Sequence, residues 1–326
     1  MPHSSELLRE ATRRRVVSRL RCPVCAEPLA EVAAGTARAL RCPRRHSFDV
    51  ARQGYVNLLT GRAPHVGDTA EMVAARVDFL AAGHYDPVSA ALAAAARAAI
   101  RGADAPDPSD TADPPDPADA ADPAEPARAA GAPFGAYPLV VDAGAGTGRH
   151  LDAVLAALPD AVGLALDVSK PALRRAAKAH PRAAAALVDT WQRLPLADAS
   201  TAVLLNVFAP RNGAEFRRVL HPAGALLVVT PTGAHLTELV DALDLLRVDP
   251  AKADRVAGSL AAHFEQVGET VLRARLELTR PEVATLVGMG PSAWHTDPAV
   301  RAARIAALPE PVAVTLAVRL TVHRPR

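Results

Sequence analysis

The pattern of hydrophobic and polar positions divides the chain into parts with different periodicities. From residue 138 onward, short apolar runs alternate with amphipathic stretches, as is typical of parallel strands joined by helices. The apolar runs predict strands at 139–142, 162–167, 184–188, 201–208 and 225–230, and the amphipathic stretches predict helices at 149–158, 171–180, 214–220 and 235–246. We therefore expect an α/β fold in which helices cover both faces of a parallel sheet.

The two flanks of this alternating region have patterns of their own. Residues 270–278 and 312–322 alternate apolar and polar side chains over long runs, which predicts a terminal antiparallel pair of strands. Earlier in the chain, residues 71–80 and 87–101 carry apolar side chains at helical spacing, and we expect Gly83 to end the first helix. These helices predict a helical connector, residues 63–101, packed on a domain formed by residues 137–326.

The cysteines add a metal site to this picture. Cys22, Cys25, Cys42 and His46 have the spacing C-x2-C-x16-C-x3-H, which suits a tetrahedral Zn²⁺ site with three thiolates and one imidazole. Four protein ligands leave no open position, so we expect one structural zinc ion in an N-terminal zinc module, residues 1–62. The alternative is three reduced cysteines beside an unrelated histidine.

Composition limits the remaining possibilities. Half of the 326 residues are hydrophobic but only 3% are aromatic, so the core must consist of Ala, Val and Leu. The sequence has no run of 18 apolar residues, and its N-terminus is polar, so we expect neither a membrane span nor a secretory signal. Reduced cysteines that hold zinc fit a cytoplasmic protein.

The formal net charge of +2 hides a strong segregation of charge. Residues 1–62 contain 12 arginines and 5 acids, whereas residues 102–127 contain eight acids and no Lys or Arg. These acids occur at every third position among Ala and Pro, which predicts a disordered, extended linker over residues 102–136. We favour a low-complexity linker over the alternative, a nucleic-acid mimic that screens a basic surface.

A glycine-rich loop lies where the strand at 139–142 turns into a helix. It reads D-x-G-x-G-x-G, with Asp142, Gly144, Gly146 and Gly148, and it lets backbone N–H groups approach a ligand at a helix N-terminus. Asp167 ends the next strand, where a carboxylate can accept both hydroxyls of an adenosine ribose. Asp189 follows the third strand, at a position suited to the adenine amino group.

Ordered carboxylates without a phosphate-binding lysine favour a cationic nucleoside over a nucleotide. The motif and the strand order resemble the class I S-adenosylmethionine (SAM) methyltransferases, whose seven-stranded Rossmann-like sheet also ends in an antiparallel pair. The alternative is a tight turn that binds nothing.

A zinc module followed by a SAM domain resembles the RlmA family of 23S rRNA (guanine-N1)-methyltransferases, in particular its actinobacterial, TlrB-like tylosin-resistance branch. The matching stretches are residues 21–25, 42–46, 48–59, 72–76, 83–85, 166–171, 206–212, 227–231 and 289–295. The resemblance covers the chain except about residues 102–136. It implies methylation of guanine N1 in hairpin 35, domain II, of 23S rRNA, with SAM as the methyl donor and resistance to tylosin-type macrolides as a consequence.

The chemistry requires an unpaired or flipped guanine that loses its N1 proton. Asn206, after the fourth strand, is placed to face SAM and to hydrogen-bond the base, and Phe208 could stack on it. We therefore interpret Asn206 and Phe208 as residues that position the base, and Asn206 also as a cofactor contact. Asp49, His84 or solvent remain open as proton acceptors.

RNA affinity is expected from arginines of the zinc module. Arg44 and Arg45 lie on the second zinc knuckle, and Arg52 and Tyr55 offer a cation and an aromatic stacking surface nearby. For each arginine, a solubilising surface charge is the competing interpretation. A homodimer is left open, because the sequence does not give the oligomeric state.

Two other functions compete with this hypothesis. One is a methyltransferase for a small molecule, such as an antibiotic intermediate, in which the zinc module forms a lid. The other is a zinc-ribbon RNA-binding protein whose SAM site is vestigial. The basic N-terminal part argues against the first, and the complete acid-and-glycine set argues against the second.

Overall fold

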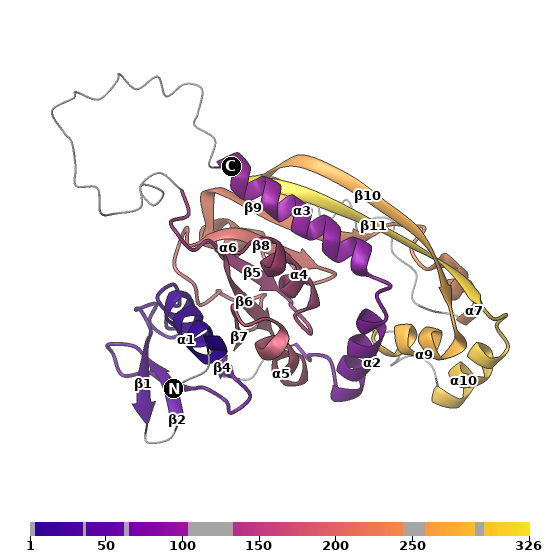
Figure 1. Ribbon diagram of the computed structural model, residues 1–326, viewed down its shortest axis with the longest axis horizontal. Coiled ribbons are helices and arrows are strands. Elements are labelled where there is room, and N and C mark those ends of the chain that lie inside the picture. Colours follow the sequence, from indigo (N-terminus) through magenta and orange to yellow (C-terminus); the bar gives the residue numbers. More distant parts are fainter. Residues whose placement is uncertain are drawn as a thin grey trace.

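Figure 1 shows the computed structural model, which describes residues 4–34, 37–61, 65–103, 133–243, 245, 258–290 and 297–326. Its centre is a mixed sheet with the strand order β10-β11-β9-β8-β5-β6-β7-β4. The five central strands are β5 (Leu139–Ala143), β6 (Val162–Asp167), β7 (Ala183–Leu187), β8 (Thr201–Val207) and β9 (Leu220–Pro231). They pair in parallel, so the predicted α/β sheet is confirmed.

The predicted antiparallel pair closes one side of this sheet. It consists of β10 (Phe264–Leu278) and β11 (Val312–Pro325), which pair along almost their whole length. β11 also pairs antiparallel with β9, so it lies between β9 and β10. This is the arrangement expected for a class I SAM methyltransferase sheet.

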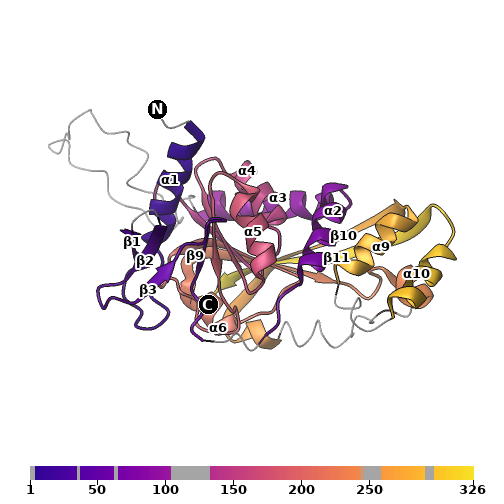
Figure 2. The same ribbon diagram turned by 90° about the horizontal axis from the view of Figure 1, so that it is seen from below.

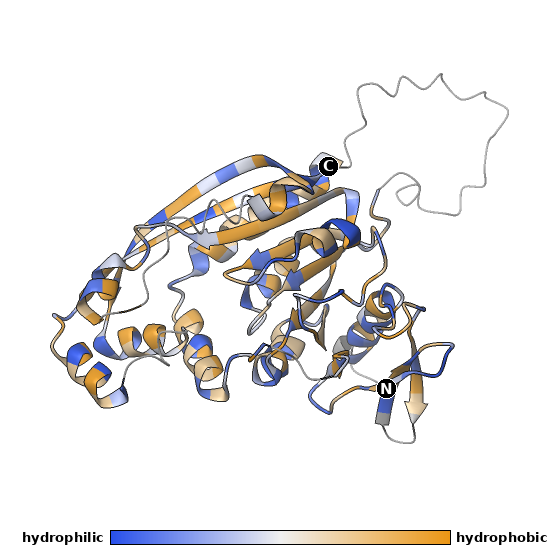
Figure 3. Cartoon of the chain, turned by 180° about the vertical axis from the view of Figure 1, so that it is seen from behind, coloured by the Kyte–Doolittle hydropathy of each residue, from blue (hydrophilic) through white to orange (hydrophobic). Residues whose placement is uncertain are grey.

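Helices cover both faces of the sheet. Neighbouring residues of a strand point to opposite faces, and both are buried. Val140 and Val141 of β5 are both fully buried, but each belongs to a different apolar cluster. One face packs against α3 (Asp86–Ala103), α4 (Arg149–Ala157) and α5 (Lys170–Ala179), and the other against α1 (Ser4–Val17) and α6 (Gly213–Val219). The central strands are largely hydrophobic (Figure 3), as burial on two faces requires.

The N-terminal part contributes a small sheet of its own and one strand of the large sheet. The small sheet consists of β1 (Ala30–Ala34), β2 (Ala37–Arg41) and β3 (Ser47–Asp49). The next strand, β4 (Tyr55–Asn57), pairs in parallel with β7 and becomes the eighth strand of the large sheet. The large sheet therefore has eight strands rather than the seven expected, and the added strand comes from the N-terminal part. The reason is that Tyr55 and Val56, both apolar, are buried at the edge of the sheet.

Two helices follow at the positions that the sequence pattern predicts. α2 (Ala70–Ala81) begins where the Thr69 side chain accepts the backbone N–H of Met72, and Gly83 lets the chain reverse after the helix with φ of 84°. α3 then lies across the sheet, with Leu92 fully buried. Residues 102–103 of the expected linker form the last turn of α3. Residues 104–132 lie outside the described residues.

Three further helices lie near the long antiparallel strands: α7 (Thr237–Leu243), α9 (Arg280–Gly288) and α10 (Pro298–Ala306). They lie at the opposite end of the molecule from the small sheet (Figures 1 and 2). Among the described residues, no helix is both long and apolar enough to cross a lipid bilayer.

Candidate metal centre and cofactor site

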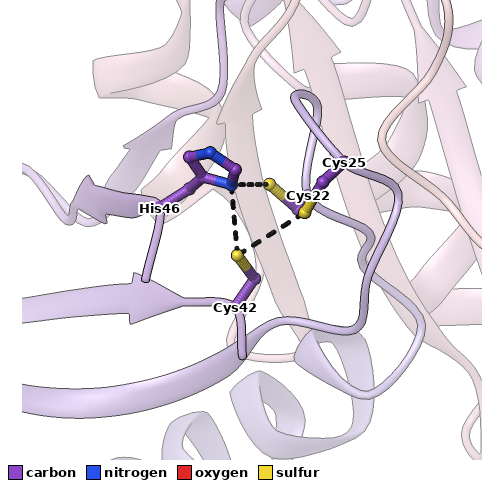
Figure 4. A group of neighbouring side chains, drawn as sticks. All are labelled: Cys22, Cys25, Cys42 and His46. Carbon is purple, nitrogen blue, oxygen red and sulfur yellow. Dashed lines mark hydrogen bonds between the residues drawn. The ribbon is translucent and has the colours of Figure 1, made fainter. Parts of the chain in front are cut away.

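The four predicted zinc ligands lie together between two turns of the N-terminal part. Figure 4 shows the Cys22, Cys25 and Cys42 thiols and the His46 ring turned toward one point, and their ligand atoms all lie within 4.8 Å of one another. The His46 Nδ1 atom is 3.5 Å from Cys22 Sγ and 3.3 Å from Cys42 Sγ, and the sulfurs of Cys25 and Cys42 are 3.6 Å apart. These separations fit the edges of a tetrahedron around Zn²⁺, about 3.8 Å for Zn–S bonds of about 2.3 Å.

Two similar turns direct the ligand side chains toward one point. Ala26 follows the first cysteine pair with φ of 60° and donates its N–H to the Cys22 carbonyl oxygen. Arg45 follows Cys42 with φ of 65° and donates its N–H to the Cys42 carbonyl oxygen. Burial alone would raise the pKa of the Cys42 thiol. Hydrogen bonds from His46 and Cys25 outweigh burial and lower that pKa to about 7, toward the thiolate that binds a metal.

The glycine loop lies at the carboxyl end of β5, as predicted. A Cβ atom added to Gly144 would lie 2.4 Å from Ala209 Cβ, and φ is 84° at this residue. The loop can therefore pass this close to the chain after β8 only with glycine here. Gly146 and Gly148 also have positive φ, and Gly148 is the N-cap of α4. The α4 N-terminus thus faces the site, as the sequence pattern predicts.

Asp167, at the end of β6, forms a hydrogen bond with this loop. Its two carboxylate oxygens accept the backbone N–H groups of Gly146 and Ser169, each at 2.8 Å. Burial raises the pKa of Asp167 although these two hydrogen bonds act in the opposite direction. Each carboxylate oxygen has a second lone pair, so Asp167 keeps the capacity to accept ligand hydroxyls.

Asp142 lies beneath the same loop and is 1% exposed. Its Oδ1 atom has no hydrogen-bond partner among the described residues. Burial raises the pKa of Asp142 to about 8, and neighbouring Asp167 acts in the same direction. A positively charged ligand would favour the ionised form of this carboxyl, so the site suits a cation.

Asp189 has a partner that the sequence did not reveal. Its Oδ2 atom is 3.0 Å from His65 Nδ1, and its Oδ1 atom accepts the N–H of Trp191 at 3.0 Å. The His65 and Trp191 rings lie 5.8 Å apart. The expected adenine end of the site is therefore closed by a histidine from the connector in this conformation.

The rest of this connecting stretch, residues 65–69, also crosses the site. The Ser169 hydroxyl donates to the Asp68 carbonyl oxygen at 2.7 Å, and a Cβ atom on Gly67 would meet the Ser169 backbone at 2.8 Å. Arg76 of α2 pairs with the Asp68 carboxylate and donates to the Met289 carbonyl oxygen at 2.8 Å. The guanidinium of Arg76 also lies over Gly146.

The amide nitrogen of Asn206 is held within the fold in this structure. The residue lies inside β8, is fully buried, and its Nδ2 group donates to the carbonyl oxygens of Ala143 (3.1 Å) and Pro210 (2.8 Å). Its Nδ2 group is thus occupied, whereas its Oδ1 atom has no hydrogen-bond partner among the described residues, and its contacts with the base and with SAM stay predictions. The strand continues to Val207, so the side chain of Asn206 falls on an inner face and holds the glycine loop to the chain after β8.

Phe208, by contrast, is 43% exposed and has φ of 51°. Its ring lies 6.1 Å from His235 at an interplanar angle of 18°, and 6.2 Å from Tyr85. The Tyr85 hydroxyl is 3.3 Å from His235 Nε2, and His235 Nδ1 accepts the backbone N–H of Ala317. The sequence pattern pointed to Phe208 but not to Tyr85 and His235, which become its neighbours only through the fold.

The two suggested proton acceptors lie in different surroundings. His84 Nε2 is 2.8 Å from Glu282 Oε1, and this contact contributes to lowering the pKa of Glu282 to about 2, after the hydrogen bonds from Thr279. Asp49 lies at the end of β3 in the small sheet and is exposed. Both residues stay predictions as acceptors of the guanine N1 proton.

The four residues suggested for RNA binding divide into two groups. Arg44, Arg45 and Arg52 are exposed, and Arg44 lies 3.7 Å from Glu27. Tyr55 is only 7% exposed, because β4 belongs to the large sheet. The expected stacking surface at Tyr55 is therefore wrong, while the three arginines stay predictions.

A family model described as RlmA, N-terminal, a zinc ribbon, matches residues 20–62. A 23S rRNA (guanine(748)-N1)-methyltransferase of Streptomyces fradiae is 50% identical over 96% of this chain and 99% of its own length. A protein of Micromonospora griseorubida, named as a 23S rRNA (guanine-N1)-methyltransferase, is 68% identical over 94% of this chain and 97% of its own. The chain belongs to the family of 23S rRNA (guanine-N1)-methyltransferases.

Among solved structures, the MccD protein has a TM-score of 0.40 at 15% identity, over 58% of this chain and 90% of that chain.

Zinc content gives the first test of the metal centre of this family member. We expect one zinc ion per chain in protein purified without chelators. Cys42→Ser should lose the metal and unfold at lower temperature, because Cys42 belongs to the apolar cluster shared with the large sheet. Elemental analysis and thermal unfolding measure both effects. Val24→Ser is the control, since Val24 lies in the other cysteine turn, is 57% exposed and offers no ligand. Full zinc content in Cys42→Ser would contradict the assignment.

Gly144→Ala tests the cofactor loop. The new methyl group would meet Ala209 and displace the loop, so SAM affinity should fall about tenfold or more, as the roughly 1–3 kcal/mol cost of inserting a methyl group into filled space implies. Gly135→Ala is the matched control, because Gly135 has φ of 66° but nothing within 4 Å of an added Cβ. Calorimetric titration with SAM measures both variants. Equal affinities in the two would separate the loop from the cofactor.

Proposed function

We propose that this protein transfers a methyl group from SAM to N1 of guanine 748 in hairpin 35 of 23S rRNA. The observation that carries the proposal is the 50% identity, over nearly the whole of both chains, to the Streptomyces fradiae enzyme named for guanine 748. The resemblance to the tylosin-resistance branch extends the proposal to protection against tylosin-type macrolides. A homodimer stays a prediction.

The described residues fit SAM. The close approach of Gly144 to Ala209 leaves no room for a side chain, and the α4 N-terminus presents backbone N–H groups. The buried Oδ1 atoms of Asp142 and Asn206 lack hydrogen-bond partners among the described residues, which suits a ligand with cationic and polar groups. When bound, SAM supplies an already activated methyl group, so the protein must mainly orient the acceptor.

Asp167 would hold the ribose and Asp189 the adenine. Because His65 holds Asp189 in this conformation, we infer that residues 65–69 shift when the adenine binds. The zinc ion, by contrast, would have four protein ligands and a structural role. The three thiols and one imidazole fit this metal by number and by separation.

The guanine must be unpaired for its N1 to be reached, and we propose that Phe208 receives it. Phe208 is the exposed aromatic ring that directly follows β8, and His235 supports it from one side. Burial lowers the pKa of His235 to about 4 and raises the pKa of Tyr85, so neither group takes up or releases a proton readily at neutral pH. We therefore assign Tyr85 and His235 to positioning Phe208, and leave the N1 proton to another group or to water.

Primer extension tests the proposed reaction. Unmodified 23S rRNA incubated with the protein and SAM should stop reverse transcriptase next to guanine 748, because N1-methylation blocks Watson–Crick pairing. Omission of SAM should remove the stop. Methyl transfer from labelled SAM to small molecules of a cell extract, without a stop in the rRNA, would refute the proposal in favour of a small-molecule methyltransferase.

Phe208→Ala should reduce kcat/KM for rRNA about 5- to 150-fold, since base stacking on one aromatic side chain contributes roughly 1–3 kcal/mol. SAM affinity should stay unchanged, because the ring contacts Tyr85 and His235 rather than the glycine loop. Phe208→Tyr keeps the ring and should retain most of the activity. If the alanine variant methylates rRNA like the wild type, the base lies elsewhere.

A further inference from the structure

We propose that the groove between α2 and α5 is a second binding surface for the RNA substrate, where exposed cations bind the phosphodiester backbone. The proposal rests on the proposed function. This α2–α5 groove has a volume of about 590 Å³ and is lined by α2, the first turn of α4, α5 and Gln53. It differs in position from the zinc knuckle with Arg44 and Arg45.

The groove has an apolar floor and a cationic rim. Small side chains form much of the floor, including Ala70, Val73, Ala74 and Val77 of α2. Four cations line the groove, namely Arg149, Arg174, Arg175 and Lys178, and the acid among the lining residues is Asp152. Such a surface combines apolar area with an excess of positive charge, as nucleic-acid grooves do.

The three cations of α5 have no structural partner among the described residues. Arg174, Arg175 and Lys178 are exposed and make no ion pair with any acid in the part of the chain that the structure describes. Arg174 and Lys178 are four residues apart on the helix, where like charges repel each other. Lys178 lies in the last turn and is favourable near the helix C-terminus, but the two arginines lie too early in the helix for this explanation.

Arginines that serve the fold of this domain look different. Arg218 contacts the carboxylates of Glu215 and Asp198, and Arg182 donates to backbone carbonyl oxygens between α4 and β6. Both arginines are half-buried. The contrast shows that the cations of α5 do not serve the fold in this way, and their place along one groove distinguishes them from other exposed arginines.

The position of the groove links the two parts of the proposed site. Thr147 of the glycine loop lies at one side of it, and Gln53 of the N-terminal part lies at another. Gln53 directly follows Arg52, an exposed arginine already suggested for RNA. One RNA strand can therefore contact the N-terminal part and α5 together while its target base reaches the cofactor site.

A small anionic ligand is the alternative occupant, because the volume lies within the range of small-molecule pockets. Such pockets hold a few polar groups that converge on one ligand, usually in a closed site. Here the cations of α5 are exposed and spread along one helix, which fits a chain of phosphates better.

The test compares two triple variants that remove the same amount of charge. Arg174→Gln/Arg175→Gln/Lys178→Gln removes the cations of the groove, and Gln keeps the helix propensity. Arg97→Gln/Arg101→Gln/Arg273→Gln is the control, since these exposed arginines lie on α3 and β10. Binding of each protein to a hairpin 35 fragment of 23S rRNA is measured at several salt concentrations, with SAM affinity and zinc content as checks of the fold.

The groove variant should reduce the log–log salt slope by about 0.7–0.9 for each phosphate that is no longer neutralised, and should bind the fragment more weakly than the control at low salt. SAM affinity and zinc content should match the wild type. Equal slopes in the two triple variants would overturn the groove proposal while wild-type methylation of guanine 748 still stands. Failure of the wild type to methylate the rRNA would instead overturn the proposed function, and the groove proposal with it.

Discussion

Burial of the N-terminal part on the parallel sheet fixes the positions of both the zinc centre and the connector. Leu20, Val56 and Leu58 are almost completely buried, and they share one apolar cluster with Cys22, Cys42 and the strands β5 and β6. Backbone hydrogen bonds from Arg21 to Pro195 and from Leu58 to Leu187 join the same surfaces. A metal ion held by these ligands would therefore stabilise a segment that forms part of the sheet's own core. Loss of the zinc ion would disturb that core as well as the two knuckles.

Parallel pairing of β4 with β7 has a direct consequence for the cofactor site. Parallel strands end at the same edge of a sheet, so the chain leaves β4 at the carboxyl edge, where SAM sites of doubly wound sheets lie. The connector must then cross this edge before α2 begins. Its contacts there, from His65 to Asp189 and from Ser169 to Asp68, follow from the direction of one short strand. Zinc centre and cofactor site are thus mechanically linked, which two independent modules would not be.

The parts of the fold and site that sequence could predict are those set by local pattern. The strand–helix alternation, the glycine loop and the zinc ligands depend on spacing within a few dozen residues, and each lies where the pattern placed it. The burial of Tyr55 and the amide contacts of Asn206 could not be predicted in this way, because their surroundings depend on distant pairing, β4 with β7 and β8 with β5. His65 and His235 gave no signal at all, since an isolated histidine acquires meaning only from the acid or ring that the fold brings to it.

The distribution of aromatic side chains supports the placement of the target base. With only six Phe, three Tyr and two Trp, the chain packs most of its core with Ala, Val and Leu. Even so, Phe79, Tyr85 and Phe208 lie in one chain of ring contacts that continues to His84 and His235. Phe79 and Tyr85 are buried members of the core, whereas Phe208 is 43% exposed. Rings are stiff and lose little side-chain entropy when a planar ligand stacks on them, so an exposed Phe208 ring that rests against buried neighbours suits a base.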